Sequence, residues 1–303
     1  MVRGQCLLIL LSLCFRAYGQ TEELNSLPKK GSYLYYGQPA FEDNSFLMEE
    51  AINQDKGVMQ YISDFYFDNI RGGNFLYSFN QEIPITHLKH QLNYTIFYHV
   101  LEATPTSDQN SGFGDINVGY RYMVFGKKDW AMVVPGITLI LPTGKSIKGQ
   151  GIGGVGGQVS LAITKRLSHK LVTHYNFGYT FISQADRYTS TITGTPVLSY
   201  EKDLRYSNLG ASIFWYPARK FNLFTEFISN YLSDIKDDGS LSHTHLTTIN
   251  PGFRFAIDHK FTQIVPGISL PVVFTDGNFT RTGIFFYLSI EPEYLPFTKS
   301  KHR

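Results

Sequence analysis

Residues 113–142 read FGDINVGYRYMVFGKKDWAMVVPGITLILP, two long runs on either side of a short polar turn. In the first run every second residue is apolar, at Ile116, Val118, Tyr120, Tyr122 and Val124. The positions between them hold Asp115, Asn117, Gly119 and Arg121. A period of two is typical of a β-strand with one apolar and one polar face. Because Trp130 opens the second run directly after the turn at 126–129, the stretch predicts a β-hairpin.

Both runs are longer than the strands of most soluble proteins. Globular strands average about five or six residues, whereas a tilted strand needs about nine to eleven to cross a bilayer. Aromatic residues lie near the ends of these runs, where the interfacial girdles of membrane barrels form. A soluble secreted β-sandwich is the alternative, but its strands would be shorter. The hairpin therefore predicts part of a transmembrane β-barrel.

The rest of the chain repeats this pattern. The predicted strands cover about 58–67, 75–83, 90–101, 114–126, 129–141, 155–166, 170–182, 205–217, 220–232, 244–257, 260–274 and 281–293. Short turns alternate with longer loops, of which 142–154 and 183–204 are the longest. Outer-membrane barrels have short periplasmic turns, longer external loops and an even strand number. We therefore predict an all-β, up-and-down antiparallel barrel of about twelve strands, over residues 57–303, in the outer membrane of a Gram-negative bacterium.

The first residues predict a signal peptide over 1–19. Arg3 precedes the apolar run 6–15, and Ala17-Tyr18-Gly19 forms a small-x-small cleavage pattern. Lipoprotein processing at Cys14 is the weaker alternative, because the preceding Leu13 is bulky. Both cysteines, Cys6 and Cys14, lie within this peptide, so the mature chain has no thiol for a disulfide or a metal site.

Residues 20–56 carry no strand pattern. Asn44-Ser45 could cap a short helix over 46–53, where Glu49 and Glu50 favour the N-terminal half. The segment also contains several aromatic residues, in which disordered tails are usually poor. It is therefore predicted to be either a periplasmic tail or a plug inside the barrel.

Seven charged residues fall on the polar face of the predicted strands. A charge on the lipid face near the midplane costs roughly 2–4 kcal/mol for Arg or Lys, so these side chains are expected to face the lumen. With two histidines of the same face, the predicted lumen-lining residues are Asp64, Glu82, His99, Asp115, Arg121, His174, Glu226, Arg254 and Glu291.

Charge and motifs argue against several other functions. Without Arg3 and Arg16 the basic and acidic side chains are equal in number, which gives no reason to expect a nucleic-acid partner. The glycine-rich run 149–157 contains Gly151-x-Gly153-x-x-Gly156, but a dinucleotide site needs a helix after it and a strand is predicted there. No cofactor and no metal site are expected.

No catalytic residues are expected either. His99 and Asp115 are placed as cross-strand neighbours, which fits a hydrogen bond at the rim or a base with its orienting carboxylate. No serine with a defined spacing accompanies them, and the chain has no His-x-Ser segment of the outer-membrane phospholipase kind. The protein is therefore predicted not to be an enzyme.

Four motifs together resemble the outer-membrane family named for the MetA pathway of phenol degradation. They are Gly112-Phe-Gly-Asp-Ile running to Tyr122, Pro135-Gly136 running to Pro142-Thr143-Gly144, the glycine-rich 149–157, and SLAITKRL at 160–167. The resemblance covers about 70 central residues well and implies an outer-membrane transporter, without catalytic or ligand residues to carry over.

The predicted function is passive uptake of small compounds, hydrophobic or aromatic ones included. The alternative is a barrel without transport that serves as a structural or interaction protein. The expected partners are outer-membrane lipid, the barrel-assembly machinery and a small-molecule substrate.

Overall fold

The computed structural model describes residues 44–54, 58–70, 73–85, 89–103, 108–126, 130–190, 196–259 and 262–292. Its strands are β1 Gln60–Phe67, β2 Phe75–Pro84, β3 His90–Leu101, β4 Asn110–Phe113, β5 Ile116–Tyr122, β6 Met132–Leu141, β7 Gly156–Ser168, β8 Leu171–Ser190, β9 Pro196–Ala218, β10 Phe221–Ile235, β11 Leu241–Phe255, β12 Ile257–His259, β13 Thr262–Ser269, β14 Val272–Thr275, β15 Asn278–Thr282 and β16 Ile284–Pro292. A short 3-10 helix, η2, covers Ser146–Lys148. Across these described ranges, no helix has the length and apolarity needed to cross a membrane.

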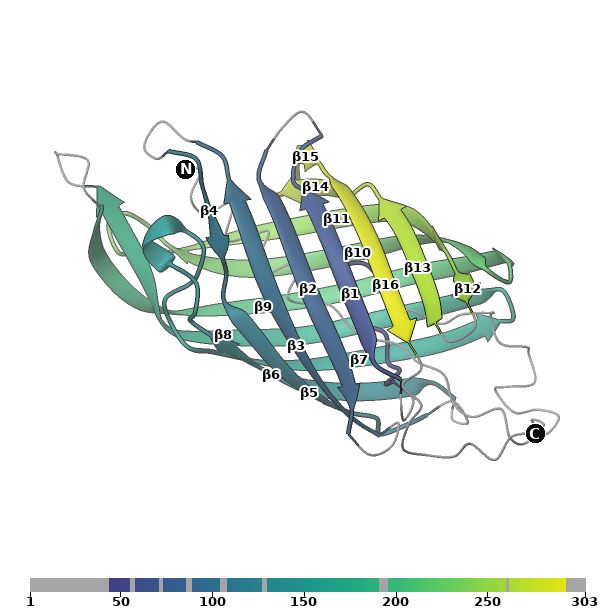
Figure 1. The fold of residues 1–303 in the computed structure, drawn as a ribbon. Coiled ribbons are helices and arrows are strands. Elements are labelled where there is room, and N and C mark those ends of the chain that lie inside the picture. Colours follow the sequence, from purple (N-terminus) through teal and green to yellow (C-terminus); the bar gives the residue numbers. More distant parts are fainter. Residues whose placement is uncertain are drawn as a thin grey trace.

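The strands form one closed antiparallel barrel (Figure 1). Neighbours in the chain pair with each other, and β1 pairs with β16, with Asp64 opposite Tyr287, which closes the wall. Four wall strands are each interrupted once, so that β4 and β5, β11 and β12, β13 and β14, and β15 and β16 count as single strands. Counted in this way the described wall has twelve strands, as the sequence predicts.

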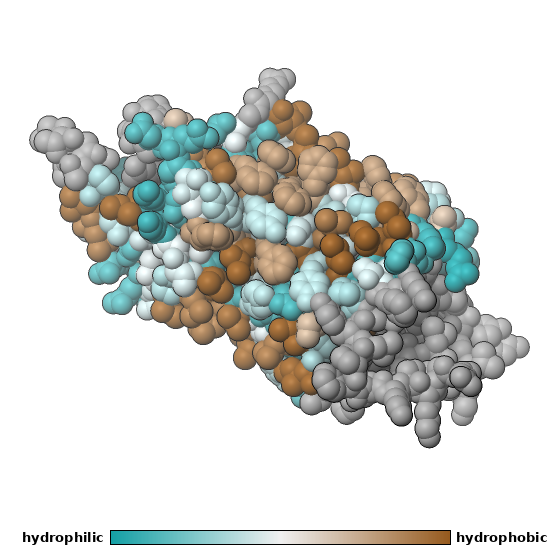
Figure 2. All heavy atoms as spheres, in the orientation of Figure 1, coloured by the Kyte–Doolittle hydropathy of each residue, from teal (hydrophilic) through white to brown (hydrophobic). Residues whose placement is uncertain are grey.

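Side chains alternate between an inner and an outer face along each strand. On β5 the inner residues Asn117 and Arg121 are buried, whereas Val118 and Tyr122 on the other face are exposed. Hydrophobic residues cover much of the visible outer wall (Figure 2). An apolar outer face on a closed barrel is covered by the lipid of the outer membrane, with the short turns on the periplasmic side and the longer connections outside.

Two expectations about the connecting segments are wrong. Residues 46–53 form no helix; they run extended, with a bend at 46–48. The predicted loop 183–204 consists largely of paired continuations of β8 and β9, for example at Thr189 opposite Val197, after a bulge between Ile182 and Ala185. Aromatic and β-branched residues favour strands, so this hairpin continues beyond the length that a bilayer needs.

Three apolar clusters fill parts of the barrel interior. Phe46, Leu47 and Met48 belong to the first, together with inner residues of the wall such as Phe214 and Phe224. The second lies around Ile140, Ile152, Ile182, Leu204 and Tyr206. The third joins Ala51 and Ile52 to Met123, Met132, Val134 and Ala162. Residues 44–54 therefore contribute to two of the three clusters and lie inside the barrel.

Candidate functional site

Residues 44–54, called the inner segment below, are bound by side chains of the surrounding wall. The Glu226 carboxylate on β10 accepts hydrogen bonds from the main-chain N–H groups of Phe46 at 3.0 Å and Leu47 at 3.1 Å. Three strands along the wall, Thr164 Oγ1 on β7 accepts the N–H of Ala51 at 2.8 Å. Because wall side chains take these N–H groups, the segment has no need of the main-chain bonds of a helix.

The Asn176 side chain on β8 binds the middle of the inner segment through both of its polar atoms. Its Nδ2 donates to the carbonyl oxygen of Glu49 at 2.7 Å, and its Oδ1 accepts the N–H of the same residue. The amide thus makes the same pair of main-chain hydrogen bonds that a residue on a neighbouring β-strand would make. The Glu49 carboxylate in turn accepts a bond from Ser160 Oγ on β7 at 3.3 Å.

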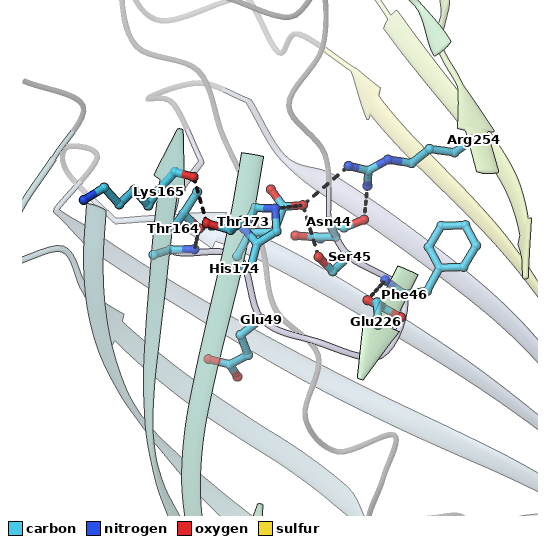
Figure 3. Close-up of polar contacts among 12 residues, drawn as sticks. Asn44, Ser45, Phe46, Glu49, Thr164, Lys165, Thr173, His174, Glu226 and Arg254 are labelled. Carbon is cyan, nitrogen blue, oxygen red and sulfur yellow. Dashed lines mark hydrogen bonds and ion pairs between the residues drawn. The ribbon is translucent and has the colours of Figure 1, made fainter. Parts of the chain in front are cut away.

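The Glu50 carboxylate is the centre of a buried charged cluster. Arg254 Nη2 on β11 lies 3.4 Å from Glu50 Oε1, and His174 Nε2 on β8 lies 3.6 Å from the same oxygen. Figure 3 shows His174 and Arg254 approaching the inner segment from opposite sides. Arg254 also donates to the carbonyl oxygen of Asn44, and Arg121 donates to the carbonyl oxygen of Glu50. Buried charges are costly unless they are paired and hydrogen-bonded, and Arg254 meets both conditions through Glu50 and the carbonyl oxygen of Asn44.

The two ends of the inner segment meet at one carboxylate of the wall. Asn44 Nδ2 donates to Glu82 Oε1 at 2.9 Å, and Gln54 Nε2 donates to Glu82 Oε2 at 3.2 Å. Gln91 Nε2 also donates to Glu82 Oε2, at 2.8 Å, and Gln91 Oε1 accepts the N–H of Gln54 at 2.6 Å. The inner segment is therefore a loop across the periplasmic half of the barrel, tied at its ends on β2 and β3.

A second segment, the outer loop 142–155, folds onto Asp115 at the opposite half of the barrel. The Asp115 carboxylate accepts the N–H of Gly144 at 2.9 Å and that of Ile152 at 2.8 Å. Ile152 then packs into the second apolar cluster, and its carbonyl oxygen accepts the N–H of Asp186 at 2.8 Å. Gly153 has φ +87°, a left-handed conformation that suits glycine. The glycine-rich run is therefore a folded loop bound to the wall.

All nine residues that the sequence predicts to line the lumen are buried in the structure, each at most 9% exposed. Those that bind the inner segment are Glu82, Arg121, His174, Glu226 and Arg254. Asp115 binds the outer loop, and Asp64 accepts a bond from Ser78 Oγ at 2.8 Å. His99 and Glu291 lie buried elsewhere in the interior.

The expected contact between His99 and Asp115 is wrong. His99 lies opposite Gly112 on β4, while Thr95 lies opposite Asn117 on β5, so the register shifts by one residue between these pairs. The shift falls at 114–115, between the two strand segments, and Asp115 turns toward the outer loop. An insertion of one residue of this kind cannot be read from a parity count.

Sequence reasoning missed the uncharged groups that bind the inner segment. Gln91, Thr164 and Asn176 each bond to its main chain, and all lie on the inner face of their strands. Their position on the polar face was the available signal, but it does not distinguish a residue that meets water from one that binds another segment. For Glu50 no such signal existed, because the segment around it has no strand period.

A hollow among the described residues lies away from this site, and no metal centre accompanies it there. A groove of about 880 Å³ lies on the outside of the wall, between outward-facing residues such as Tyr179, Arg205 and Tyr231. Within the described ranges, no group of three or more His, Cys, Asp or Glu side chains is placed to hold a metal ion.

Replacing Glu226 should loosen the inner segment. Hydrogen bonds to a charged group contribute about 1.5–3 kcal/mol each, and Glu226→Ala removes those to Phe46 and Leu47. Ser45 is 1% exposed, so Ser45→Cys should resist a maleimide reagent in the otherwise unchanged barrel and react much faster when combined with Glu226→Ala.

Thr180→Ala is the matched control, because it removes a buried hydrogen bond to Gln158 elsewhere in the interior. It should leave the labelling of Ser45→Cys slow. Ser240→Cys in an external turn should react quickly in every background. Equal labelling of Ser45→Cys with and without Glu226→Ala would contradict the proposed anchoring.

The family described as "Putative MetA-pathway of phenol degradation" matches residues 38–261. A solved outer-membrane channel of the COG4313 group from Pseudomonas putida F1 is 12% identical, with a TM-score of 0.53 over 78% of this chain and 95% of that one. The Ralstonia pickettii toluene transporter TbuX is 10% identical, with a TM-score of 0.41 over 88% and 94%. The NanC porin is 6% identical, with a TM-score of 0.43 over 77% and 98%. No curated protein matches the chain.

Proposed function

This chain belongs to the MetA-pathway phenol-degradation family, and from that premise we propose that it is a passive outer-membrane channel for small, uncharged aromatic or apolar molecules. We further propose that the inner segment is its plug and that movement of this segment opens the passage. The channel itself carries out no catalytic step in this proposal.

The observation that carries the proposal is the composition of the interior. Channels for hydrophilic solutes have a polar, water-filled lumen. Here several charged and polar side chains of the inner face bind the inner segment and the outer loop, and apolar clusters that include Phe46 and Ile152 lie beside them. A solute that displaced these segments would meet the apolar and aromatic side chains of these clusters beside the charged groups, which favours a solute with an apolar or aromatic body.

The size of the barrel and the family support the same reading. Eight-stranded barrels are filled by side chains and sixteen-stranded porins hold an open channel, so a wall of twelve leaves room for a plug that can move. The family description names phenol degradation, and a channel for aromatic compounds would supply the substrates of such a pathway. The barrel-assembly machinery is the partner that we propose for insertion.

Uptake by whole cells tests the proposal. A Gram-negative host that lacks this barrel should take up radiolabelled phenol at low external concentration faster when it expresses the protein, and uptake of a disaccharide should not change. Host cells that express an unrelated closed barrel at the same level are the control. If both solutes enter at the control rate, the alternative of a structural or interaction barrel is favoured.

A further inference from the structure

The Phe46 ring of the inner segment lies in a pocket of the wall that is built from other aromatic rings. Its centroid is 4.8 Å from that of Tyr287, with the planes 13° apart, and 4.6 Å from that of Phe224, with the planes at 65°. Phe285 completes the group at 5.5 Å. Stacked and edge-on contacts at these separations are the favourable arrangements of aromatic rings. The pocket therefore surrounds one ring with both kinds of contact.

A glycine of β13 makes the room for this ring. A Cβ atom at Gly267 would overlap the tip of the Phe46 ring and would crowd the Arg254 side chain opposite it. Gly252 on β11 leaves space for the Phe224 ring in the same way. We call the cavity bounded by Phe224, Gly267, Phe285 and Tyr287 the ring pocket.

The wall supplies the ring pocket, and the inner segment supplies only its occupant. The lining residues come from β10, β13 and β16, whose pairings within the barrel do not depend on the inner segment. Phe46 reaches the pocket from the inner segment, whose main chain is held there by Glu226. If the inner segment leaves the interior, Phe46 leaves with it and the Glu226 carboxylate loses two hydrogen-bond donors.

We propose that the ring pocket is a binding site for a single uncharged aromatic ring, and that Phe46 occupies it as an internal competitor while the barrel is closed. This rests on the proposed channel function, because it assumes that such molecules enter the interior. Glu226 then keeps the bond from Asn250 Nδ2 and can accept a hydroxyl group on the ring in place of the two main-chain donors, so phenols are the substrate class that fits both parts of the site.

Phe46→Ala in the full chain tests the pocket by emptying it. An apolar cavity left by the removal of a large buried side chain can stay dry and take up a single aromatic ring. Calorimetric titration of the purified barrel in detergent should show phenol binding to Phe46→Ala at least about tenfold more tightly than to the unchanged protein. Cyclohexanol has the same size and hydroxyl group without the aromatic face, and should bind about tenfold more weakly than phenol.

Met48→Ala is the matched control. Met48 is as buried as Phe46 and belongs to the same apolar cluster, but it packs against Gly210. Its removal creates space outside the ring pocket and should leave phenol affinity near that of the unchanged protein. Phenol binding that is equal in the Phe46→Ala and Met48→Ala variants would overturn the proposal.

A second variant covers the case in which Phe46→Ala does not fold, as judged by its migration on an unboiled gel. Phe46→Leu keeps an apolar side chain without a ring, and should bind phenol more tightly than the unchanged protein. Equal affinities would again overturn the ring pocket. If cells take up phenol but neither Phe46 variant binds it more tightly, the ring pocket is wrong and the proposed channel function stands. If the variants bind phenol but cells do not take it up, the channel function is wrong and the ring pocket stands.

Discussion

A barrel that lacks residues 44–54 should conduct several times more current in a planar bilayer than the full chain, while it folds and inserts equally well. The inner segment crosses the periplasmic half of the interior and fills it with Phe46, Leu47 and Met48 on one side and Ala51 and Ile52 on the other. Its removal leaves Glu82, Arg121, Glu226 and Arg254 facing an open space that water can enter. Hydrated charged groups on the inner wall then support ion flow.

The control for this deletion is a chain that lacks residues 21–40 and keeps the whole inner segment. Its conductance should stay close to that of the full chain. Both variants should migrate faster on a denaturing gel before boiling than after it, because folded barrels resist the detergent. If the deletion of 44–54 folds in this sense and its conductance equals that of the full chain, the inner segment is not the plug.

The wall of this barrel was predictable because the period-two rule applies to each strand separately. Val118 and Tyr122 could be assigned to the outside, and Asn117 and Arg121 to the inside, from their alternation alone. The cost of a charge in lipid fixes which face is which, so the positions of Glu226 and Arg254 follow from the same rule. Neither step requires knowledge of which strands are neighbours.

What the inner groups contact was not predictable in this way. Glu226 binds the main chain of Phe46, and Arg254 binds Glu50, across separations of 180 and 204 residues. The inner segment has no period because its N–H groups bond to side chains of several different strands, which leaves no repeat in its own sequence. The prediction of a helix over 46–53 was wrong for that reason. The register shift before β5 is a local insertion that parity also cannot show.

Arginine placed at Ala211 should prevent most of the protein from inserting into lipid vesicles. Ala211 lies on the outer face of β9, opposite Tyr175 on β8 and Phe227 on β10, which also face outward. It stands midway between Trp215, near the periplasmic turn, and Ser207, which pairs with Tyr179 and Tyr231 at the level of the outer aromatic side chains. A charge near the midplane costs roughly 2–4 kcal/mol, a large fraction of the roughly 5–15 kcal/mol by which folded proteins are stable.

Ser207→Arg tests the same charge on the same strand and face at a different depth. Near the interface an arginine costs only about 0–1 kcal/mol, because its guanidinium reaches the headgroups. Urea titration in vesicles should therefore show a large loss of stability for Ala211→Arg and a small one for Ser207→Arg, with Ala211→Gln between them. If both arginine variants fold equally well, the outer face of β9 at Ala211 does not meet hydrocarbon. The level at which the membrane is placed along β9 would then be wrong, because an arginine that faces hydrocarbon at the midplane must lose hydration and destabilise the barrel.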